Sequence, residues 1–389
     1  MTLFSIVFIL LLFIDCALKY YLNQRQISAI NRSFNQVPAA FHSQISLEEH
    51  HKAGRYSLAK LNLGKVELIY GVILVLIFTL GGGIDKIAQL TQFSNYPISS
   101  EVGLIIVYSL ISSALGLPLS YYSTFKIEQA FGFNKMTLGL FIKDLIKGTL
   151  LGLIIGVPLL YLVMWLMNSL GATWWLWVWG VMVIFNLLIL TIYPTFIAPL
   201  FNKFTPLEDL ELKARIETLL SECGFKSQGV FVMDGSKRSS HGNAYFTGLG
   251  ASKRIVFFDT LLKQLSHDEI IAVLAHELGH FKHKHILKQM LTSFGIMLVG
   301  LFVFSLLINQ SWFYAGLNVS QINPASGLLL LFILTSIISL PLAPLSSFMS
   351  RKNEFEADDF AKAHANKQDL ISGLVKLYRD NASTLTPDD

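Results

Sequence analysis

The chain has 389 residues, of which 53% are hydrophobic and only 14% are charged, and its mean hydropathy is +0.53. A soluble domain carries about 25% charged residues, so this composition excludes an ordinary soluble protein and predicts a membrane protein with a lipid bilayer around it. The net charge of +4 is too small for a nucleic-acid-binding surface, and no nucleic-acid partner is expected. Cys16 and Cys223 form neither a CxxC pair nor a disulfide framework.

Seven apolar stretches are long enough to span a bilayer, which takes about 20 mostly apolar residues in a helix. They are 2–21, 66–83, 102–122, 146–168, 173–197, 288–308 and 326–348. The first looks like a signal peptide, but Asp15 and Cys16 interrupt its end and no small-x-small cleavage site follows. It is therefore predicted to be an uncleaved anchor helix.

Lysine and arginine residues alternate between the loops and thereby predict the orientation of the chain. The loops after the first, third, fifth and seventh spans carry most of them, including Arg25, Lys126 and Arg351. The opposite loops are nearly bare, with Lys86 as an exception. Because cytoplasmic loops carry an excess of positive charge, we expect the N-terminus outside and the C-terminus in the cytoplasm.

Polar residues are concentrated in two segments with two spans between them, which predicts a catalytic domain interrupted by membrane helices. The predicted organisation is 1–199 for spans one to five with their cytoplasmic loops, 200–287 for the first part of the catalytic domain, 288–349 for spans six and seven, and 350–389 for the remainder of that domain.

The segment 200–287 has the pattern of a mixed α+β domain. Its periodicity predicts a helix at 208–222 and short strands at 229–233, 243–249 and 254–258. Turn-forming residues at 250–253 predict a hairpin between the last two strands. Ser266 and Glu269 form a capping-box pattern that opens an apolar-periodic helix.

That helix contains the motif His276-Glu277-Leu278-Gly279-His280. Two histidines four residues apart lie one turn apart on the same helix face, so both imidazoles can reach one tetrahedral zinc ion. Glu277 lies beside the metal without binding it, where it can take a proton from zinc-activated water. The pattern predicts a zinc metalloprotease with Glu277 as general base and one Zn²⁺ per chain.

A catalytic zinc needs a third protein ligand and one open position. The best candidate is Glu354, in the segment Glu354-Phe355-Glu356-Ala357-Asp358. If this segment is helical, Glu354 and Asp358 share a face and Glu356 points roughly the opposite way. Asp358 would then hold a ligand histidine in the correct tautomer. From spacing alone, a solvated acidic helix face is an equally good explanation.

His283 and His285 follow the motif but lie off the face that His276 and His280 share. We expect them to be cationic residues at the end of the helix, near a membrane surface, rather than zinc ligands.

The strand that begins near Asn243 is a suitable partner for an extended peptide substrate, whose main chain can add to a sheet edge. Asn243 can hold a backbone amide of such a peptide. The alternative is that Asn243 is a turn residue after Gly242.

Several motifs together resemble the type-I CAAX prenyl protease family, a family of integral-membrane zinc endopeptidases that has bacterial relatives. The resemblance covers most of the chain. It is carried by 118–122, 124–128, 131–134, 193–202, 243–246, 276–280 and 354–358.

The resemblance implies a mainly α, polytopic membrane protein with seven transmembrane helices around a water-filled chamber. A gluzincin-like α+β zinc-protease domain would place the metal near the cytoplasmic side. The family's zinc ligands match His276, His280 and Glu354, its catalytic glutamate matches Glu277, and its substrate-strand asparagine matches Asn243. The bacterial-type relationship implies an inner-membrane location and a peptide or protein substrate.

One departure from the family pattern leaves a second interpretation open. Family members usually continue beyond the point at which this sequence stops, at Asp389, with a histidine and an arginine near the active site. Loss of such oxyanion donors costs about 3 kcal/mol, or about 100-fold in rate. The alternative is therefore a catalytically impaired, zinc-containing quality-control or peptide-binding membrane protein. A zinc transporter would need metal-binding pairs inside the spans, where only Asp15 and Glu67 stand out.

Overall fold

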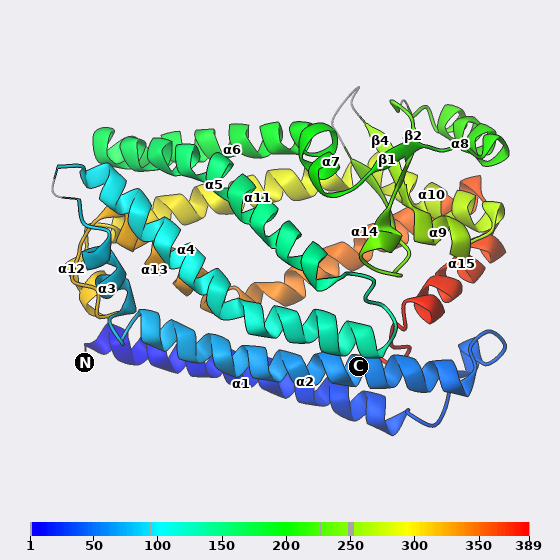
Figure 1. Ribbon diagram of the computed structural model, residues 1–389, viewed down its shortest axis with the longest axis horizontal. Coiled ribbons are helices and arrows are strands. Elements are labelled where there is room, and N and C mark those ends of the chain that lie inside the picture. The colour runs from blue at the N-terminus through cyan, green and yellow to red at the C-terminus, as the bar shows by residue number, and fades with distance from the viewer. Residues whose placement is uncertain (1, 94, 226, 248–252, 389) are drawn as a thin grey trace.

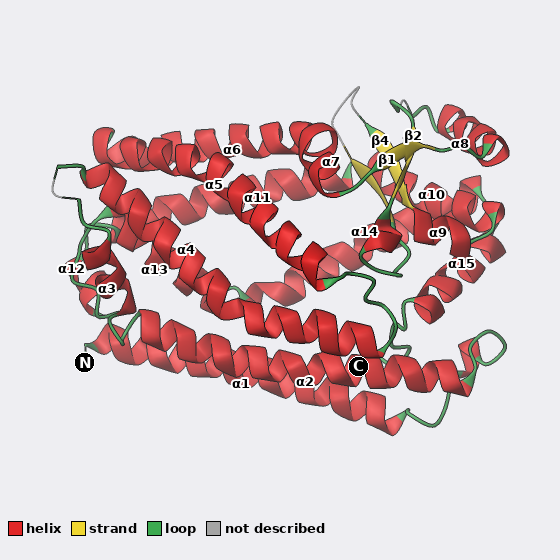
Figure 2. Ribbon diagram, viewed as in Figure 1, coloured by secondary structure: helices red, strands yellow, loops and turns green. Residues whose placement is uncertain are grey.

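The computed structural model describes residues 2–93, 95–225, 227–247 and 253–388. Figures 1 and 2 show long helices along one axis and a small sheet near one end. The α-helices are α1 (Leu3–Arg32), α2 (Leu47–Phe78), α3 (Gly83–Leu90), α4 (Pro97–Tyr122), α5 (Leu138–Ser169), α6 (Trp174–Ile192), α7 (Ala198–Phe201), α8 (Leu210–Glu222), α9 (Asp259–Gln264), α10 (His267–Lys282), α11 (His285–Leu307), α12 (Ser311–Ala315), α13 (Pro324–Ile338), α14 (Ala343–His364) and α15 (Lys367–Asp380). The strands are β1 (Phe204–Pro206), β2 (Val230–Met233), β3 (Ala244–Thr247) and β4 (Arg254–Phe258).

Six helices within the described residues are long and apolar enough to cross a membrane, and a bent pair makes a seventh crossing if it counts as one span. This confirms the predicted polytopic, mainly α architecture. The predicted seventh span, 326–348, is divided between α13 and α14, whose axes differ by 47°. Pro341 and Pro344 lie at this break, where proline removes backbone donors and prevents a continuous helix.

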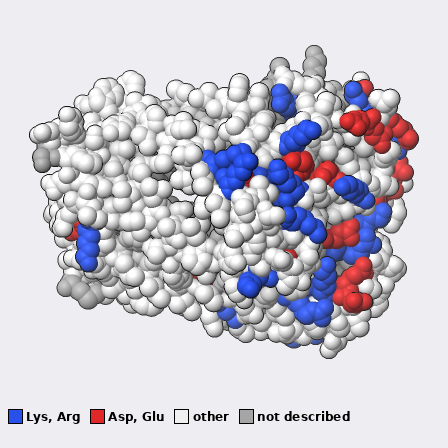
Figure 3. All heavy atoms as spheres, in the orientation of Figure 1, with Lys and Arg blue, Asp and Glu red and all other residues white. Residues whose placement is uncertain are grey.

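The helices run back and forth between two ends of the molecule. The start of α1 and the short helices α3 and α12 lie at one end, whereas the sheet and α8, α9, α10 and α15 lie at the other (Figure 1). Charged side chains gather over the end that carries the sheet, and the opposite part of the visible face is almost uncharged (Figure 3). An uncharged band over the long helices is the surface expected for contact with lipid.

Most residues of the apolar helices lie on surfaces that the protein itself does not bury. In the most apolar stretch of each long helix, only 6–22% of the residues are buried inside the protein. One large apolar cluster, which includes Met164, Phe304 and Tyr314, joins several of the helices. Sparse burial fits helices that surround an open interior, but the chamber itself stays a prediction.

The sheet has the strand order β1-β2-β4-β3. Strands β2 and β4 are parallel, while β3 pairs antiparallel with β4 from Ala244–Phe257 to Thr247–Arg254. The three predicted strands and the pairing of the last two are therefore confirmed, although residues 248–252 of the predicted hairpin lie outside the described part. Because β3 is at the edge of the sheet, one side of its backbone remains available for another strand.

Helix α10 forms as its sequence predicts. The Ser266 hydroxyl accepts a hydrogen bond from the Glu269 amide, and the Glu269 carboxylate accepts one from the Ser266 amide. The apolar face of α10 is buried in a second cluster with residues of α8, β4 and α14, including Ile270, Leu274 and Leu278. Burial of each such side chain contributes about 1.5–3 kcal/mol of stability. Because this face must be buried, the rotation of the helix is fixed, and so is the direction in which its histidines point.

Candidate metal centre and catalytic cleft

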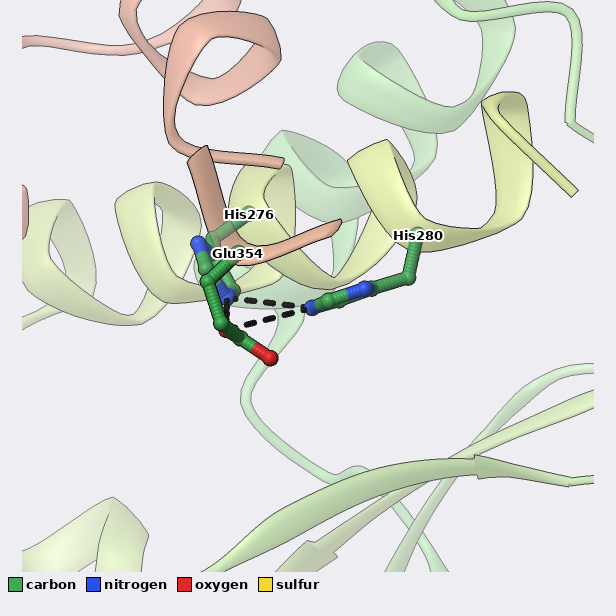
Figure 4. Close-up of side chains that lie close together, drawn as sticks. All are labelled: His276, His280 and Glu354. Atoms are coloured by element: carbon green, nitrogen blue, oxygen red, sulfur yellow. Dashed lines mark hydrogen bonds and ion pairs between the residues drawn. The ribbon is translucent and has the colours of Figure 1, made fainter. Parts of the chain in front are cut away.

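Three side chains from two helices converge in the structure, as the sequence predicts. The Nε2 atoms of His276 and His280 are 3.3 Å apart. The Oε2 atom of Glu354 is 3.3 Å from His276 Nε2 and 3.6 Å from His280 Nε2. Figure 4 shows the three donor atoms at the corners of a triangle, with the histidines on α10 and Glu354 on α14.

These separations suit a zinc ion. Zinc–nitrogen and zinc–oxygen bonds are about 2.0–2.2 Å long, so two ligands of a tetrahedral zinc lie about 3.3–3.5 Å apart. The measured edges of 3.3, 3.3 and 3.6 Å match this spacing. Two imidazoles and one carboxylate also leave a fourth position open, as in catalytic zinc sites.

A close crossing of α10 and α14 brings the carboxylate to the histidines. At Gly279, an added Cβ would lie 2.8 Å from the Cα and 3.0 Å from the carbonyl oxygen of Ala357. Glycine and alanine therefore let the two backbones touch one residue before His280 and three residues after Glu354. A side chain at position 279 would therefore push the two helices apart.

Asp358 lies one turn after Glu354 on the same helix face and contacts His276. Its Oδ1 is 2.8 Å from His276 Nδ1, the ring nitrogen that faces away from the triangle. An Nδ1–H group that donates to this carboxylate leaves the Nε2 lone pair free for a metal.

Glu277 faces a cleft of about 140 Å³ beside the triangle, which is also lined by Asn243, Ala244, Val273 and His276. Burial raises the pKa of its carboxyl above the usual range; the charge of His276 lowers the pKa in part, and that of Glu354 raises it. Within the described residues, no side chain donates a hydrogen bond to this carboxylate. It is therefore free to take a proton from a molecule in the cleft.

Asn243 lies at the start of β3, on the wall of the same cleft. Its Oδ1 accepts a hydrogen bond from the Ala244 amide at 2.8 Å, and its carbonyl oxygen accepts one from the Phe258 amide at 3.0 Å. The exposed side-chain NH₂ can still donate. Asn243 thus combines the features of a turn residue with a position at the edge strand.

His285 is expected to be a cationic residue at the helix end near a membrane surface, but the structure buries its side chain. This side chain is only 5% exposed, and its Nδ1 lies 3.0 Å from Nδ1 of the candidate ligand His280. Its Nε2 lies 2.9 Å from Oε2 of Glu356. The contact between His285 and His280 cannot be predicted from helical spacing. It requires the left-handed backbone of Lys284, with φ of 57°, between α10 and α11. His283 is 39% exposed, in agreement with the expectation.

Membrane-spanning helices together with a His-Glu-x-x-His helix and a carboxylate opposite it define an integral-membrane metallopeptidase. Two family models divide almost the whole chain between them. Residues 26–203 match the CAAX prenyl protease N-terminal region with five membrane helices, and residues 206–386 match peptidase family M48. The chain belongs to peptidase family M48, with the N-terminal membrane region of CAAX prenyl proteases.

Similar proteins extend over nearly the full length. CAAX prenyl protease 1 of Saccharomyces cerevisiae is 35% identical and aligns with 95% of this chain and 87% of the relative. The human homologue of CAAX prenyl protease 1 is 33% identical over 93% of this chain and 86% of the relative. The crystal structure of Saccharomyces mikatae Ste24p matches with a TM-score of 0.92 and 34% identity, and covers 100% of this chain and 94% of that one.

These similarities make the chain a multi-pass membrane metalloendopeptidase, a hydrolase that acts on peptide or protein substrates. Membership of family M48 implies a metal ion, typically zinc.

Proposed function

We propose that this chain is a zinc endopeptidase with one Zn²⁺ bound by His276, His280 and Glu354. The observation that carries the proposal is the triangle of 3.3–3.6 Å edges between their donor atoms. A surface acidic helix face would not place one of its carboxylates at zinc-ligand distance from two imidazoles.

When bound by His276, His280 and Glu354, a zinc ion would supply Lewis acidity to a peptide carbonyl and to water. Glu277 accepts the proton of the attacking water in the cleft and passes it to the leaving amine. Its raised pKa suits the first transfer, because burial makes the carboxylate a stronger base towards the proton of water. Asp358 holds His276 in the tautomer that presents Nε2, and the buried apolar face of α10 fixes both imidazoles.

An extended peptide adds to the free edge of β3, where its main chain continues the sheet into the cleft beside Glu277. Asn243 donates its side-chain NH₂ to a backbone carbonyl of that peptide. The two relatives compared above are both CAAX prenyl proteases by name, so we propose a prenylated CAAX peptide, or another peptide held at the membrane, as substrate.

The proposed domains are the membrane helices of 1–199 and 288–349 and the two catalytic segments 200–287 and 350–389. The proposed orientation has the N-terminus outside and the catalytic segments in the cytoplasm, with a bacterial inner membrane as the proposed location. The charge over the end that carries the sheet supports this orientation (Figure 3). A C-terminal reporter that is active only in the cytoplasm should be active, whereas a reporter that is active only outside should be silent at the same position. The reverse result would invert the proposed orientation.

The decisive experiment measures cleavage of a farnesylated CAAX peptide by the purified full-length protein in detergent. Glu277→Gln should bind a full equivalent of zinc and lose at least about 100-fold in kcat. His283→Ala, on the neighbouring turn, should cleave normally. A Glu277→Gln variant that cleaves at the wild-type rate would refute the assignment. Wild-type protein that binds zinc and peptide without cutting would favour the peptide-binding alternative.

A further inference from the structure

We infer that His285 and Glu356 complete the metal centre as positioning residues that fix the proton on His280. The inference rests on the proposed zinc site. His276 has a carboxylate behind it in Asp358, at 2.8 Å, whereas His280 has a second imidazole in the corresponding place, at 3.0 Å. Behind that imidazole lies the carboxylate of Glu356, 2.9 Å from His285 Nε2.

The proton positions follow from the bonding of a neutral imidazole. A metal on Nε2 of His280 leaves the hydrogen on Nδ1. Since Nδ1 of His285 is only 3.0 Å away, it must accept that hydrogen and cannot carry one of its own. The hydrogen of His285 is then on Nε2, which donates to Glu356. The chain of donors thus runs from His280 through His285 to a carboxylate.

The backbone is arranged to make this contact. Within one helix, residues five apart point in different directions, so His285 could not lie behind His280 if α10 continued. The helix ends instead, and Lys284 takes a left-handed conformation that L-amino acids other than glycine rarely adopt. Helix α11 then begins at His285, whose side chain is buried to 5% exposure. A buried imidazole needs partners for both nitrogens, and His280 and Glu356 supply them.

The same side chains raise a competing possibility. His283, His285 and Glu356 offer three donor atoms within 4.8 Å of one another, so they form a candidate second cation site. A cation on His285 Nε2 would force the hydrogen onto His285 Nδ1. This hydrogen would then face the Nδ1 hydrogen of zinc-bound His280 across 3.0 Å. Zinc on His280 therefore disfavours a metal on His285, and the positioning role is the one the geometry supports.

The positioning role explains why α14 contributes carboxylates from two faces. Glu354 points to the triangle, Asp358 contacts His276 from behind, and Glu356 contacts His285. This part of α14 thereby supplies one proposed ligand, contacts one ligand imidazole from behind through Asp358, and contacts the second through His285.

Zinc affinity tests this inference without reference to turnover. The full-length protein in detergent is titrated against a competing chelator, and bound metal is counted. His285→Leu should weaken zinc binding about 10–100-fold, and Glu356→Gln should weaken it by a smaller factor. The double variant should bind zinc as weakly as His285→Leu alone, because Glu356 acts through His285. The Co²⁺-substituted visible spectrum should shift in both single variants. His283→Ala is the matched control and should bind zinc as the wild type does.

Several outcomes would overturn the inference. They are an unchanged affinity in Glu356→Gln, independent and additive losses in the double variant, or a second bound zinc that His283→Ala removes. If His285→Leu fails to fold, Glu356→Gln and its spectrum decide, because this change keeps the side-chain shape. If His276→Ala also keeps its zinc, the proposed zinc site itself is wrong; if only His276→Ala loses zinc, the positioning role alone fails.

Discussion

Gly279 and Ala357 are in backbone contact at the crossing of α10 and α14, with 2.8 Å between the position of a Cβ on Gly279 and the Cα of Ala357. The backbone at Ala357 cannot turn aside as a flexible side chain can, so any larger residue at position 279 must push α14 away. The proposed ligand His280 follows Gly279 on α10, and the proposed ligand Glu354 lies three residues before Ala357 on α14.

Gly279→Ala should therefore weaken zinc binding and destabilise the protein by about 1–3 kcal/mol, through overpacking at the helix crossing. Helix propensity acts in the opposite direction, with a gain of about 1 kcal/mol for alanine. Gly295→Ala in α11 is the control, since a Cβ there meets nothing within 4 Å. Thermal unfolding and chelator titration of both variants measure the effects. Wild-type zinc affinity in Gly279→Ala would show that the spacing of the helices does not govern the site.

The second prediction separates a ligand from its supporting carboxylate. Glu354→Ala should lose stoichiometric zinc, because only two protein ligands remain. Asp358→Asn should keep zinc but bind it about 10–100-fold more weakly, since the amide holds His276 less firmly. Metal analysis after dialysis against a weak chelator distinguishes the two. Full zinc occupancy in Glu354→Ala would show that another residue is the third ligand.

The third prediction concerns Asn243. Loss of one backbone hydrogen bond to substrate costs about 1 kcal/mol, so Asn243→Ala should lower kcat/KM by about 5–10-fold. Asn243→Asp keeps the oxygen that accepts from the Ala244 amide but lacks the NH₂ donor. It should be impaired as well, if the amide holds the peptide. Normal kcat/KM in Asn243→Asp would mean that Asn243 only stabilises the turn before β3 and does not hold the peptide.

The fourth prediction is a dependence of stability on pH. Glu269 is buried, which by itself raises the pKa of its carboxyl, but hydrogen bonds from Lys376 and Ser372 outweigh burial and lower the pKa below its ordinary 4.5. The ionised side chain lies 2.7 Å from Lys376 Nζ and so ties α10 to α15. Its contribution is complete at pH values above 4.5 and is lost as the pH falls through the lowered pKa.

Glu269→Gln should accordingly lower stability at neutral pH by about 1–3 kcal/mol and flatten the decline on the acid side. Asp268→Asn changes the adjacent residue, whose side chain is 61% exposed, and should alter stability by less than about 1 kcal/mol. Thermal unfolding, measured from neutral pH down to values below the lowered pKa of Glu269, gives the dependence of stability on pH for the wild type and for each variant. Parallel curves for wild type and Glu269→Gln would mean that another group titrates.

Much of the site is encoded locally and was therefore predictable. The spacing of His276 and His280 needs only a helix, and the capping box at Ser266 and Glu269 starts that helix. The approach of Glu354 needs a long-range packing contact, so the spacing of Glu354 and Asp358 left a solvated acidic face equally possible, and the contacts come from the structure.

Other features depend on tertiary structure or on short irregular segments. The role of His285 requires the chain reversal at Lys284, which no helical pattern predicts. Strand β1 has three residues, too few for a visible alternation, and owes its conformation to pairing with β2. The apolar stretch 326–348 predicts a single span, because hydropathy is insensitive to the bend that Pro341 and Pro344 introduce.

The two halves of the proposed metal centre are separated along the chain by α11 and the bent pair of α13 and α14. Glu354 is therefore synthesised only after these helices, and a chain that ends before α14 would lack the proposed third ligand. The proposed zinc site would then form last, after the membrane helices that bring its two halves together.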